Sequence, residues 1–286
     1  MTRLVSEQVA GIGSDLDQYD QDLIRKTGLN LRRIAARAAG INEGPALEAL
    51  SRCRVAVVPV TAGQGVISGF SAAVHGIVSH LGADSRVVPE SDVAGLAGAV
   101  EEGAGVVFMA DDRRFVVLNL ATRLVVDNTW ATARGYASAL AAMTGGLKGQ
   151  KVLVLGAGRV GRSAVPSLKE LGAVVGVYDP VRQRAEALAL ESGAALEEDP
   201  DWALSVYRHI FCAAPAPGIL RADQIKPDTF IAAPGIPACF GPEVYRLARD
   251  RLVHDPLQIG VATMLLAALN SRRPSDGRRQ EYLLKK

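Results

Sequence analysis

Aromatic residues and excess charge are both scarce in this sequence. Only 5% of the 286 residues are Phe, Trp or Tyr, and the formal net charge is +2. Proteins that bind nucleic acid usually present a basic surface with aromatic side chains, so neither feature indicates that role. With 49% hydrophobic and 22% charged residues, the composition is that of a soluble globular protein with a large core. The length suggests two domains.

Residues that commonly bind metals are few and scattered. Cys53, Cys212 and Cys239 lie far apart, mostly among apolar neighbours, which favours reduced core thiols over disulfides or a metal site. The histidines are equally dispersed: His75, His80, His209 and His254. We therefore predict no structural metal.

Long apolar runs are absent as well. No stretch approaches the roughly 18 apolar residues of a membrane-spanning helix. The N-terminal region carries Glu7, Asp15 and Asp17 instead of the positive charge and apolar segment of a signal peptide. We expect a cytoplasmic protein with no membrane partner, in which the basic segment 271–286 is a flexible tail.

The most informative stretch is 151–179. Residues 151–155 form an apolar run typical of a buried parallel strand, and Gly156, Gly158 and Gly161 follow it in a G-x-G-x-x-G pattern. The first glycine permits a tight turn, the second lets a pyrophosphate approach, and the third lets the next helix pack on the strand. The helix N-terminus would face the phosphates. With a strand before the turn and a helix after it, the pattern predicts a dinucleotide site rather than a purely structural turn.

A second apolar strand, 173–178, ends at Asp179. A carboxylate at this position can accept both ribose hydroxyls of adenosine and repels a 2′-phosphate, which predicts NAD rather than NADP. Arg182 and Arg184, just past the acid, could pair a 2′-phosphate, but a solvated basic face is the simpler interpretation.

The whole chain alternates strands and helices, which predicts an α/β fold with parallel pairing. We expect a smaller N-terminal α/β substrate domain at 1–145 and a C-terminal Rossmann NAD-binding domain at 146–270. Ligands in such folds lie beyond the carboxyl ends of strands. The predicted cofactor-binding residues are Gly156, Gly158, Arg159, Val160, Gly161, Asp179, Ala214, Pro215, Pro234 and Gly235.

Several longer motifs resemble those of the PylD family, the NAD-dependent 3-methylornithyl-lysine dehydrogenases that complete pyrrolysine biosynthesis. The similar segments are Val58 to Ile67 (VPVTAGQGVI), Phe108 to Asp112 (FMADD), Asn128, the Gly156 to Gly161 turn, Ala233 to Pro237 (APGIP) and Pro256 to Ala262 (PLQIGVA). The resemblance covers most of the chain.

This resemblance implies oxidation by NAD of the terminal primary amine of lysine-Nε-3-methylornithine. The resulting imine or aldehyde would condense with the nearby α-amino group, with loss of ammonia and water, to form the pyrroline ring of pyrrolysine. It also implies that Leu4, Phe70, Asp111 and Asn128 line the substrate pocket, with Asp111 and Asn128 as the catalytic residues and the N-terminal helix closing over the site. Ala62 is a further predicted substrate-binding position, where a serine is expected; the alanine removes one hydroxyl that could touch the substrate.

The implied roles are chemically reasonable. Asp111 could hold the substrate ammonium or relay its proton, and Asn128 could hydrogen-bond polar groups without adding charge. Leu4 and Phe70 would exclude water during hydride transfer. Simpler roles are also open: a turn cap for Asp111, a helix N-cap for Asn128 and a core position for Phe70.

Two other functions remain open. The chain could be another amino-acid or shikimate-type NAD-dependent dehydrogenase, since the cofactor half cannot identify the substrate. It could also be a sensor that binds NAD without turnover. His254 and Asp255 could form a proton-relay pair, although a structural histidine is the more common case. A homo-oligomer is possible.

Overall fold

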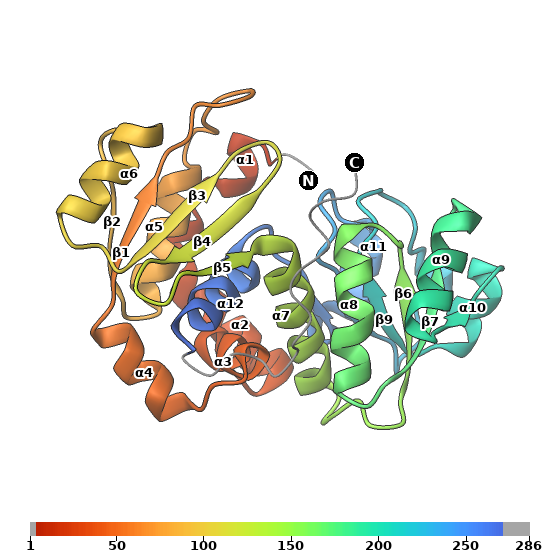
Figure 1. Ribbon diagram of the computed structural model, residues 1–286. Coiled ribbons are helices and arrows are strands. Elements are labelled where there is room, and N and C mark those ends of the chain that lie inside the picture. The colour runs from red at the N-terminus through yellow and green to blue at the C-terminus, as the bar shows by residue number, and fades with distance from the viewer. Residues whose placement is uncertain (1–3, 271–286) are drawn as a thin grey trace.

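Two β-sheets lie on either side of a central group of helices in the computed structural model, which describes residues 4–270 (Figure 1). The basic tail at 271–286 lies outside the described residues. Within those residues, no helix is long and apolar enough to cross a membrane. No group of three or more His, Cys, Asp or Glu side chains among them is placed to hold a metal ion.

The first sheet belongs to the N-terminal half and has the order β2-β1-β3-β4-β5. Its strands are β1 (Arg54–Val58), β2 (Asp84–Val87), β3 (Val106–Ala110), β4 (Phe115–Asn119) and β5 (Leu124–Asp127). β1 pairs in parallel with β2 and β3, whereas β3, β4 and β5 form an antiparallel meander. The sequence pattern predicted parallel pairing, and this antiparallel meander makes the sheet mixed.

Helices cover both faces of β1, and alternate side chains of this strand point to each helix layer. Val55 and Val57 belong to the main core, which includes α5 (Phe70–His80), whereas Ala56 and Val58 pack in a smaller cluster with α6 (Asp92–Glu101). Successive strand residues point to opposite faces, so a strand covered on both sides is apolar throughout. This explains the continuous apolar run in the sequence.

The second sheet is entirely parallel, with the order β11-β10-β9-β6-β7-β8. Its strands are β6 (Lys151–Leu155), β7 (Val174–Tyr178), β8 (Ala195–Leu196), β9 (His209–Cys212), β10 (Phe230–Ala232) and β11 (Leu252–Val253). The accompanying helices are α8 (Arg159–Glu170), α9 (Arg182–Ser192), α10 (Pro200–Val206) and α11 (Pro242–Ala248). The strand order reverses between β6 and β9, the position where Rossmann folds bind dinucleotides. The predicted Rossmann fold is confirmed.

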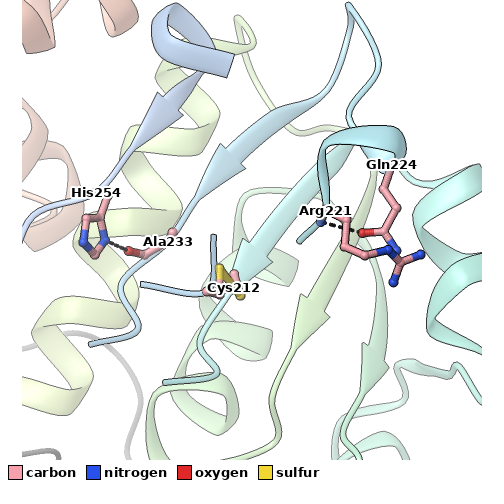
Figure 2. Close-up of a disulfide and its surroundings, with 6 residues drawn as sticks. Cys212, Arg221, Gln224, Ala233 and His254 are labelled. Atoms are coloured by element: carbon pink, nitrogen blue, oxygen red, sulfur yellow. Dashed lines mark hydrogen bonds between the residues drawn. A yellow bond between two sulfur atoms is a disulfide. The ribbon is translucent and has the colours of Figure 1, made fainter. Parts of the chain in front are cut away.

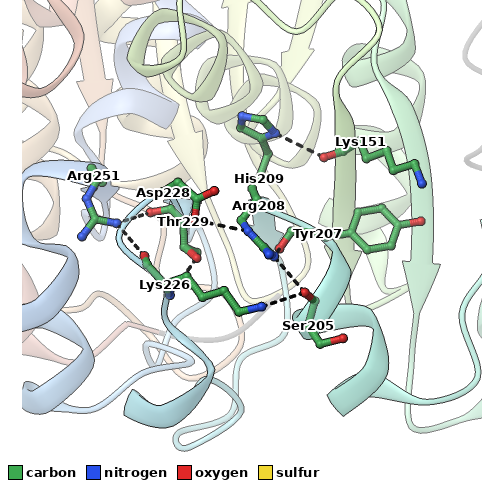
Figure 3. Close-up of polar contacts among 9 residues, drawn as sticks. All are labelled: Lys151, Ser205, Tyr207, Arg208, His209, Lys226, Asp228, Thr229 and Arg251. Atoms are coloured by element: carbon green, nitrogen blue, oxygen red, sulfur yellow. Dashed lines mark hydrogen bonds and ion pairs between the residues drawn. The ribbon is translucent and has the colours of Figure 1, made fainter.

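Polar contacts hold the amino ends of these strands (Figure 3). The Arg251 guanidinium donates to the carbonyl oxygens of Lys226 and Thr229 at 3.1 and 2.7 Å, and His209 Nδ1 lies 3.3 Å from the Lys151 carbonyl oxygen. These residues all lie at or just before the start of a strand. They therefore stabilise the edge of the sheet opposite the ligand side.

The central helices join the two halves. They are α2 (Leu16–Thr27), α3 (Leu31–Ala39), α7 (Asn128–Met143) and α12 (Gln258–Leu269), with the short α1 (Ser6–Val9) and α4 (Glu43–Ser51) at the periphery of the first half. α7 contacts both α12 and α8, and so touches each half.

The position of α12 differs from the sequence-based division. Residues 146–270 were expected to form one cofactor domain, but α12 packs on α3, α4, α5, β4 and β5 as well as on α7. Two glycines permit the close contact between α7 and α12. A Cβ on Gly135 would lie 2.4 Å from Ile259 Cγ2, and one on Gly260 would lie 2.8 Å from Asn128 Oδ1.

The cysteines also differ from the expectation. Cys212, at the end of β9, forms a disulfide with Cys239 from the loop after β10, and their Cα atoms are 6.7 Å apart (Figure 2). The expectation of reduced thiols was wrong for this pair, because sequence separation does not show that the loop folds back beside β9. Cys53 is a buried free thiol, and burial raises its pKa to about 11.

Candidate active site

The glycine turn after β6 provides the space that a dinucleotide needs. A Cβ on Gly161 would lie 1.8 Å from the Gly156 carbonyl oxygen, and one on Gly156 would lie 3.0 Å from the Ala214 nitrogen. At Gly158, in contrast, a Cβ would meet no atom of the described residues within 4 Å. Gly158 is the N-cap of α8 and makes no side-chain cap bond, so the first N–H groups of this helix can donate to an anion. The turn therefore fits a pyrophosphate.

Asp179 lies beside this turn. It is only 8% exposed, and its Oδ2 accepts the Ala157 N–H at 2.7 Å while Oδ1 accepts the Val181 N–H at 2.8 Å. Each carboxylate oxygen has a second lone pair, so both can still accept a ribose hydroxyl. The two backbone bonds hold the carboxylate at the carboxyl end of β7, where the prediction placed it.

The turns after β9 and β10 meet the glycine turn. A Cβ on Gly235 would lie 2.5 Å from the Ala214 carbonyl oxygen, and Ala214 is also the close neighbour of Gly156. Pro215 and Pro234 adjoin these two residues in the chain. The predicted cofactor residues of three strand ends therefore lie along one edge, where Figure 2 shows Cys212, Ala233 and His254 in a row.

The hydrogen bonds of His254 and Asp255 go to other residues of the described chain. His254 Nδ1 lies 2.6 Å from the Ala233 carbonyl oxygen, so this nitrogen carries the proton (Figure 2). Asp255 Oδ2 accepts the hydroxyls of Tyr19 and Tyr136 at 2.8 and 2.9 Å. Burial raises the pKa of Asp255, and burial together with this carboxylate raises the pKa of both tyrosines.

The Asp255 cluster joins distant parts of the chain. Tyr19 belongs to α2, Tyr136 to α7, and Asp255 follows β11 and also accepts the Leu257 N–H at 3.0 Å through Oδ1. Sequence analysis missed the cluster because its members are 236 and 119 residues apart. The local signal was Asp255 itself, an acid that precedes Pro256 at the end of a strand.

A pocket of about 120 Å³ opens beyond the carboxyl ends of β1 and β3. It gathers Leu4 from the N-terminal segment, Phe70 from the start of α5 and Asp111 from the turn after β3. Phe70 packs edge-on against Phe115, with ring centroids 5.2 Å apart, and so belongs both to the hydrophobic core and to the pocket wall. The other residues that line the pocket include Val58, Gln64, Ile67, Phe108, Met109 and Asp112. The pocket is thus apolar, with acidic groups at one side.

Asp111 is an exposed carboxylate in a turn. Its Oδ1 accepts the N–H groups of Arg114 and Arg113 at 2.7 and 2.8 Å, and chiefly the Arg114 bond lowers the pKa of Asp111. The turn-capping role considered from the sequence is present. Both bonds go to Oδ1, so Oδ2 can accept another donor. A carboxylate that remains charged at neutral pH can pair with an ammonium ion but is a weak proton acceptor.

Two predicted substrate residues do not line this pocket. Asn128 is the first residue of α7, and its Oδ1 accepts the Thr132 hydroxyl at 3.2 Å beside Gly260. The N-cap of α7 is Asp127, which accepts the Thr129 N–H at 2.8 Å, so Asn128 does not have that role. Ala62 is exposed in the loop after β1, outside the pocket walls.

An arginine of the glycine turn connects the two sites. The Arg159 guanidinium donates to the Arg113 carbonyl oxygen at 3.2 Å and lies 3.9 Å from Asp127 Oδ2. Arg113 is in the same turn as Asp111. The turn of the Rossmann half therefore touches the turn that carries the pocket carboxylate, a contact that sequence analysis did not anticipate.

Comparison with known proteins gives two family matches. Residues 8–126 match the N-terminal domain of pyrrolysine biosynthesis protein PylD. Residues 115–221 match the NAD binding domain of D-isomer specific 2-hydroxyacid dehydrogenases.

Two curated relatives match almost the whole chain. The chain is 30% identical over 270 residues to pyrrolysine synthase of Methanosarcina acetivorans, covering 94% of this chain and 100% of the relative. It is also 30% identical over 269 residues to pyrrolysine synthase of Methanosarcina barkeri, covering 94% and 98%.

Solved structures with a similar arrangement include two dehydrogenases. Shikimate 5-dehydrogenase from Thermus thermophilus is 20% identical with a TM-score of 0.49, over 78% of this chain and 95% of that one. Quinate dehydrogenase from Corynebacterium glutamicum is 14% identical with a TM-score of 0.49, over 76% and 93%.

Proposed function

The chain belongs to the pyrrolysine synthase (PylD) family and is an NAD-dependent oxidoreductase of pyrrolysine biosynthesis, and we propose that it catalyses the final step. In this proposal it oxidises the terminal amine of lysine-Nε-3-methylornithine, and the product cyclises to pyrrolysine. The observation that carries the proposal is the contact between the glycine turn and the Asp111 turn. This contact supports the proposal because the turn that carries Asp111, whose carboxylate can pair with an ammonium group, lies against the turn that would bind the dinucleotide.

The cofactor residues have separate tasks. The backbone around Gly158 and the N-terminus of α8 would hold the pyrophosphate, and Asp179 would accept hydrogen bonds from the adenosine ribose. When bound, NAD supplies the hydride acceptor. The turns at Ala214 and Gly235 lie on the side of β9 and β10 and would position the other end of the dinucleotide.

Asp111 would hold the amine that is oxidised. Its lowered pKa keeps it ionised, so it can pair with the substrate ammonium throughout the neutral range. The ammonium must lose a proton before its carbon can release hydride. Because Asp111 is exposed, that proton can pass along the carboxylate to water. Leu4 and Phe70 would keep water from the reacting carbon.

Ring closure needs no further oxidant in this proposal. Oxidation converts the carbon that bears the amine into an imine, and hydrolysis of this imine uses one water and releases ammonia. The aldehyde then condenses with the α-amino group of the same ornithine unit, forms the ring C=N bond and returns the water. A pocket that holds the chain folded brings these two groups together.

The experiment that tests the proposal is incubation of the purified protein with lysine-Nε-3-methylornithine and NAD. We expect equal amounts of NADH and of a product with the mass of pyrrolysine. Reduction of NAD without this product would favour another amino-acid or shikimate-type dehydrogenase. NAD binding without turnover of any amine would favour the sensor.

A further inference from the structure

An ion-pair cluster lies beside the predicted adenosine end of the cofactor site. Arg182, the first residue of α9, donates from Nε to Glu186 Oε1 and from a terminal nitrogen to Glu198 Oε1, both at 2.6 Å. Arg182 follows β7 by four residues and Glu198 follows β8 by two, so the pair bridges the carboxyl ends of neighbouring strands. This is the edge where the sheet would bind the dinucleotide.

The cluster lies close in the chain to Asp179. Asp179 is pinned by the Ala157 and Val181 N–H groups, so it cannot move aside to admit a phosphate without breaking bonds to the glycine turn. Arg182, three residues after Asp179 in the chain, has the carboxylates of Glu186 and Glu198 as its partners. A 2′-phosphate here would meet a buried negative charge and an arginine already paired with two acids.

We propose that Glu186 and Glu198 are specificity-determining residues that hold Arg182 in ion pairs and so keep it from accepting the 2′-phosphate of NADP. In this arrangement Asp179 repels the phosphate, and the two glutamates prevent Arg182 from compensating. The inference rests on the proposed position of the cofactor over the glycine turn. It goes beyond the role of Asp179, because it assigns part of the discrimination between NAD and NADP to two glutamates that would contact neither ribose hydroxyl.

The chain provides a matched control on the same helix. Glu191, in the last turn of α9, pairs with Arg162 of α8 at 2.7 Å. Glu191→Gln changes the charge of α9 as Glu186→Gln does but leaves the Arg182 cluster intact. Glu186, Glu198 and Glu191 are all at least 43% exposed at their side chains, so glutamine should be tolerated at each position.

The experiment measures NAD and NADP dissociation constants by calorimetry, without substrate. The proteins are wild type, Glu186→Gln/Glu198→Gln, Glu191→Gln, Asp179→Asn, and Asp179→Asn combined with the glutamate pair. We expect Glu186→Gln/Glu198→Gln to strengthen NADP binding about three- to tenfold, and by more when Asp179→Asn is also present. This is the size expected when Arg182 gains a partly exposed, charge-assisted contact to the phosphate. NAD binding should change less than about twofold, since ribose hydroxyls carry no charge.

A further substitution identifies the cation. Adding Arg182→Gln to the variant that combines Asp179→Asn, Glu186→Gln and Glu198→Gln should remove the gain in NADP affinity. Adding Arg184→Gln to the same variant should leave most of that gain. The inference is overturned if the glutamate pair leaves NADP binding unchanged in both backgrounds, if Glu191→Gln gives the same gain, or if Arg182→Gln does not remove it. If wild type binds neither nucleotide, the proposed cofactor site itself fails, which is a separate result.

Discussion

The proposed cofactor site and the proposed substrate pocket are built in different ways. The proposed cofactor site is mostly backbone: a glycine turn, the first N–H groups of α8, and one carboxylate that accepts a hydrogen bond from that turn. The pocket is made of side chains from the N-terminal segment, α5 and the turn after β3. Backbone sites depend on a few glycines within one motif, whereas side-chain sites depend on how distant segments pack. Five variants, with two further control substitutions, test this difference.

Gly161→Ala should have the largest effect. The new Cβ would lie 1.8 Å from the Gly156 carbonyl oxygen, so α8 must shift away from β6. We expect the free energy of unfolding to fall by roughly 2–3 kcal/mol and NAD binding to weaken more than about 100-fold. Denaturant unfolding and calorimetry measure both quantities.

Gly158→Ala is the matched control for this turn. Its Cβ meets no described atom within 4 Å, so stability should stay within about 0.5 kcal/mol of wild type. NAD binding should still be lost, because the methyl group takes the space of the pyrophosphate. Wild-type NAD affinity in this variant would contradict the assignment of the turn.

Asp111→Asn should lower kcat/KM by about 100- to 1000-fold, as expected when a charged group that orients the reacting amine is removed. NAD affinity measured by calorimetry should not change. The pKa of Asp111 is lowered from 3.8, so its charged form is favoured and is lost only as pH falls below that ordinary value. The ratio of wild-type to variant kcat/KM should therefore be constant from about pH 5 to pH 9. A ratio that changes steeply near neutrality would mean that Asp111 titrates there.

Tyr136→Phe should lower the free energy of unfolding by about 1–3 kcal/mol, the cost of leaving buried polar groups unpaired. The hydroxyl donates to Asp255 and accepts the Asp255 N–H at 2.7 Å, so its removal weakens the joint between α7 and the loop before α12. Tyr245→Phe, at a position of α11 that is 43% exposed, is the control and should change stability by less than about 0.5 kcal/mol. Equal losses of stability in Tyr136→Phe and Tyr245→Phe would show that the Asp255 cluster does not stabilise the packing of α7.

Phe70→Leu should have the smallest effect. The smaller side chain loses the edge contact with Phe115 and enlarges the pocket, so KM for the amine should rise about three- to tenfold. The value of kcat should change less because Asp111 remains in place. Trp202→Leu, an exposed position in the Rossmann half, should alter neither constant. A large loss of kcat with unchanged KM would show that Phe70 does more than form the wall.

The outcome of sequence analysis follows the same division. The Gly156 turn and the strand that ends at Asp179 were found from local pattern, because strand, turn and helix signals are short-range. The placement of α12 was not found, since a helix that is apolar on every side does not indicate which half it packs on. The Cys212–Cys239 disulfide and the Arg159 contact with Arg113 were missed for a related reason: their partners are 27 and 46 residues apart.

Local sequence pattern was enough to identify the Rossmann half, its glycine turn and the carboxylate proposed to favour NAD, because periodicity and turn chemistry act over a few residues. The family resemblance implied one pocket for Leu4, Phe70, Asp111 and Asn128, but the packing of the chain brings only the first three into it and leaves Asn128 and Ala62 outside its walls. Only the tertiary structure decided that Tyr19, Tyr136 and Asp255 form one buried cluster. Burial brings such residues together through the packing of whole helices and sheets, and no short segment contains that information.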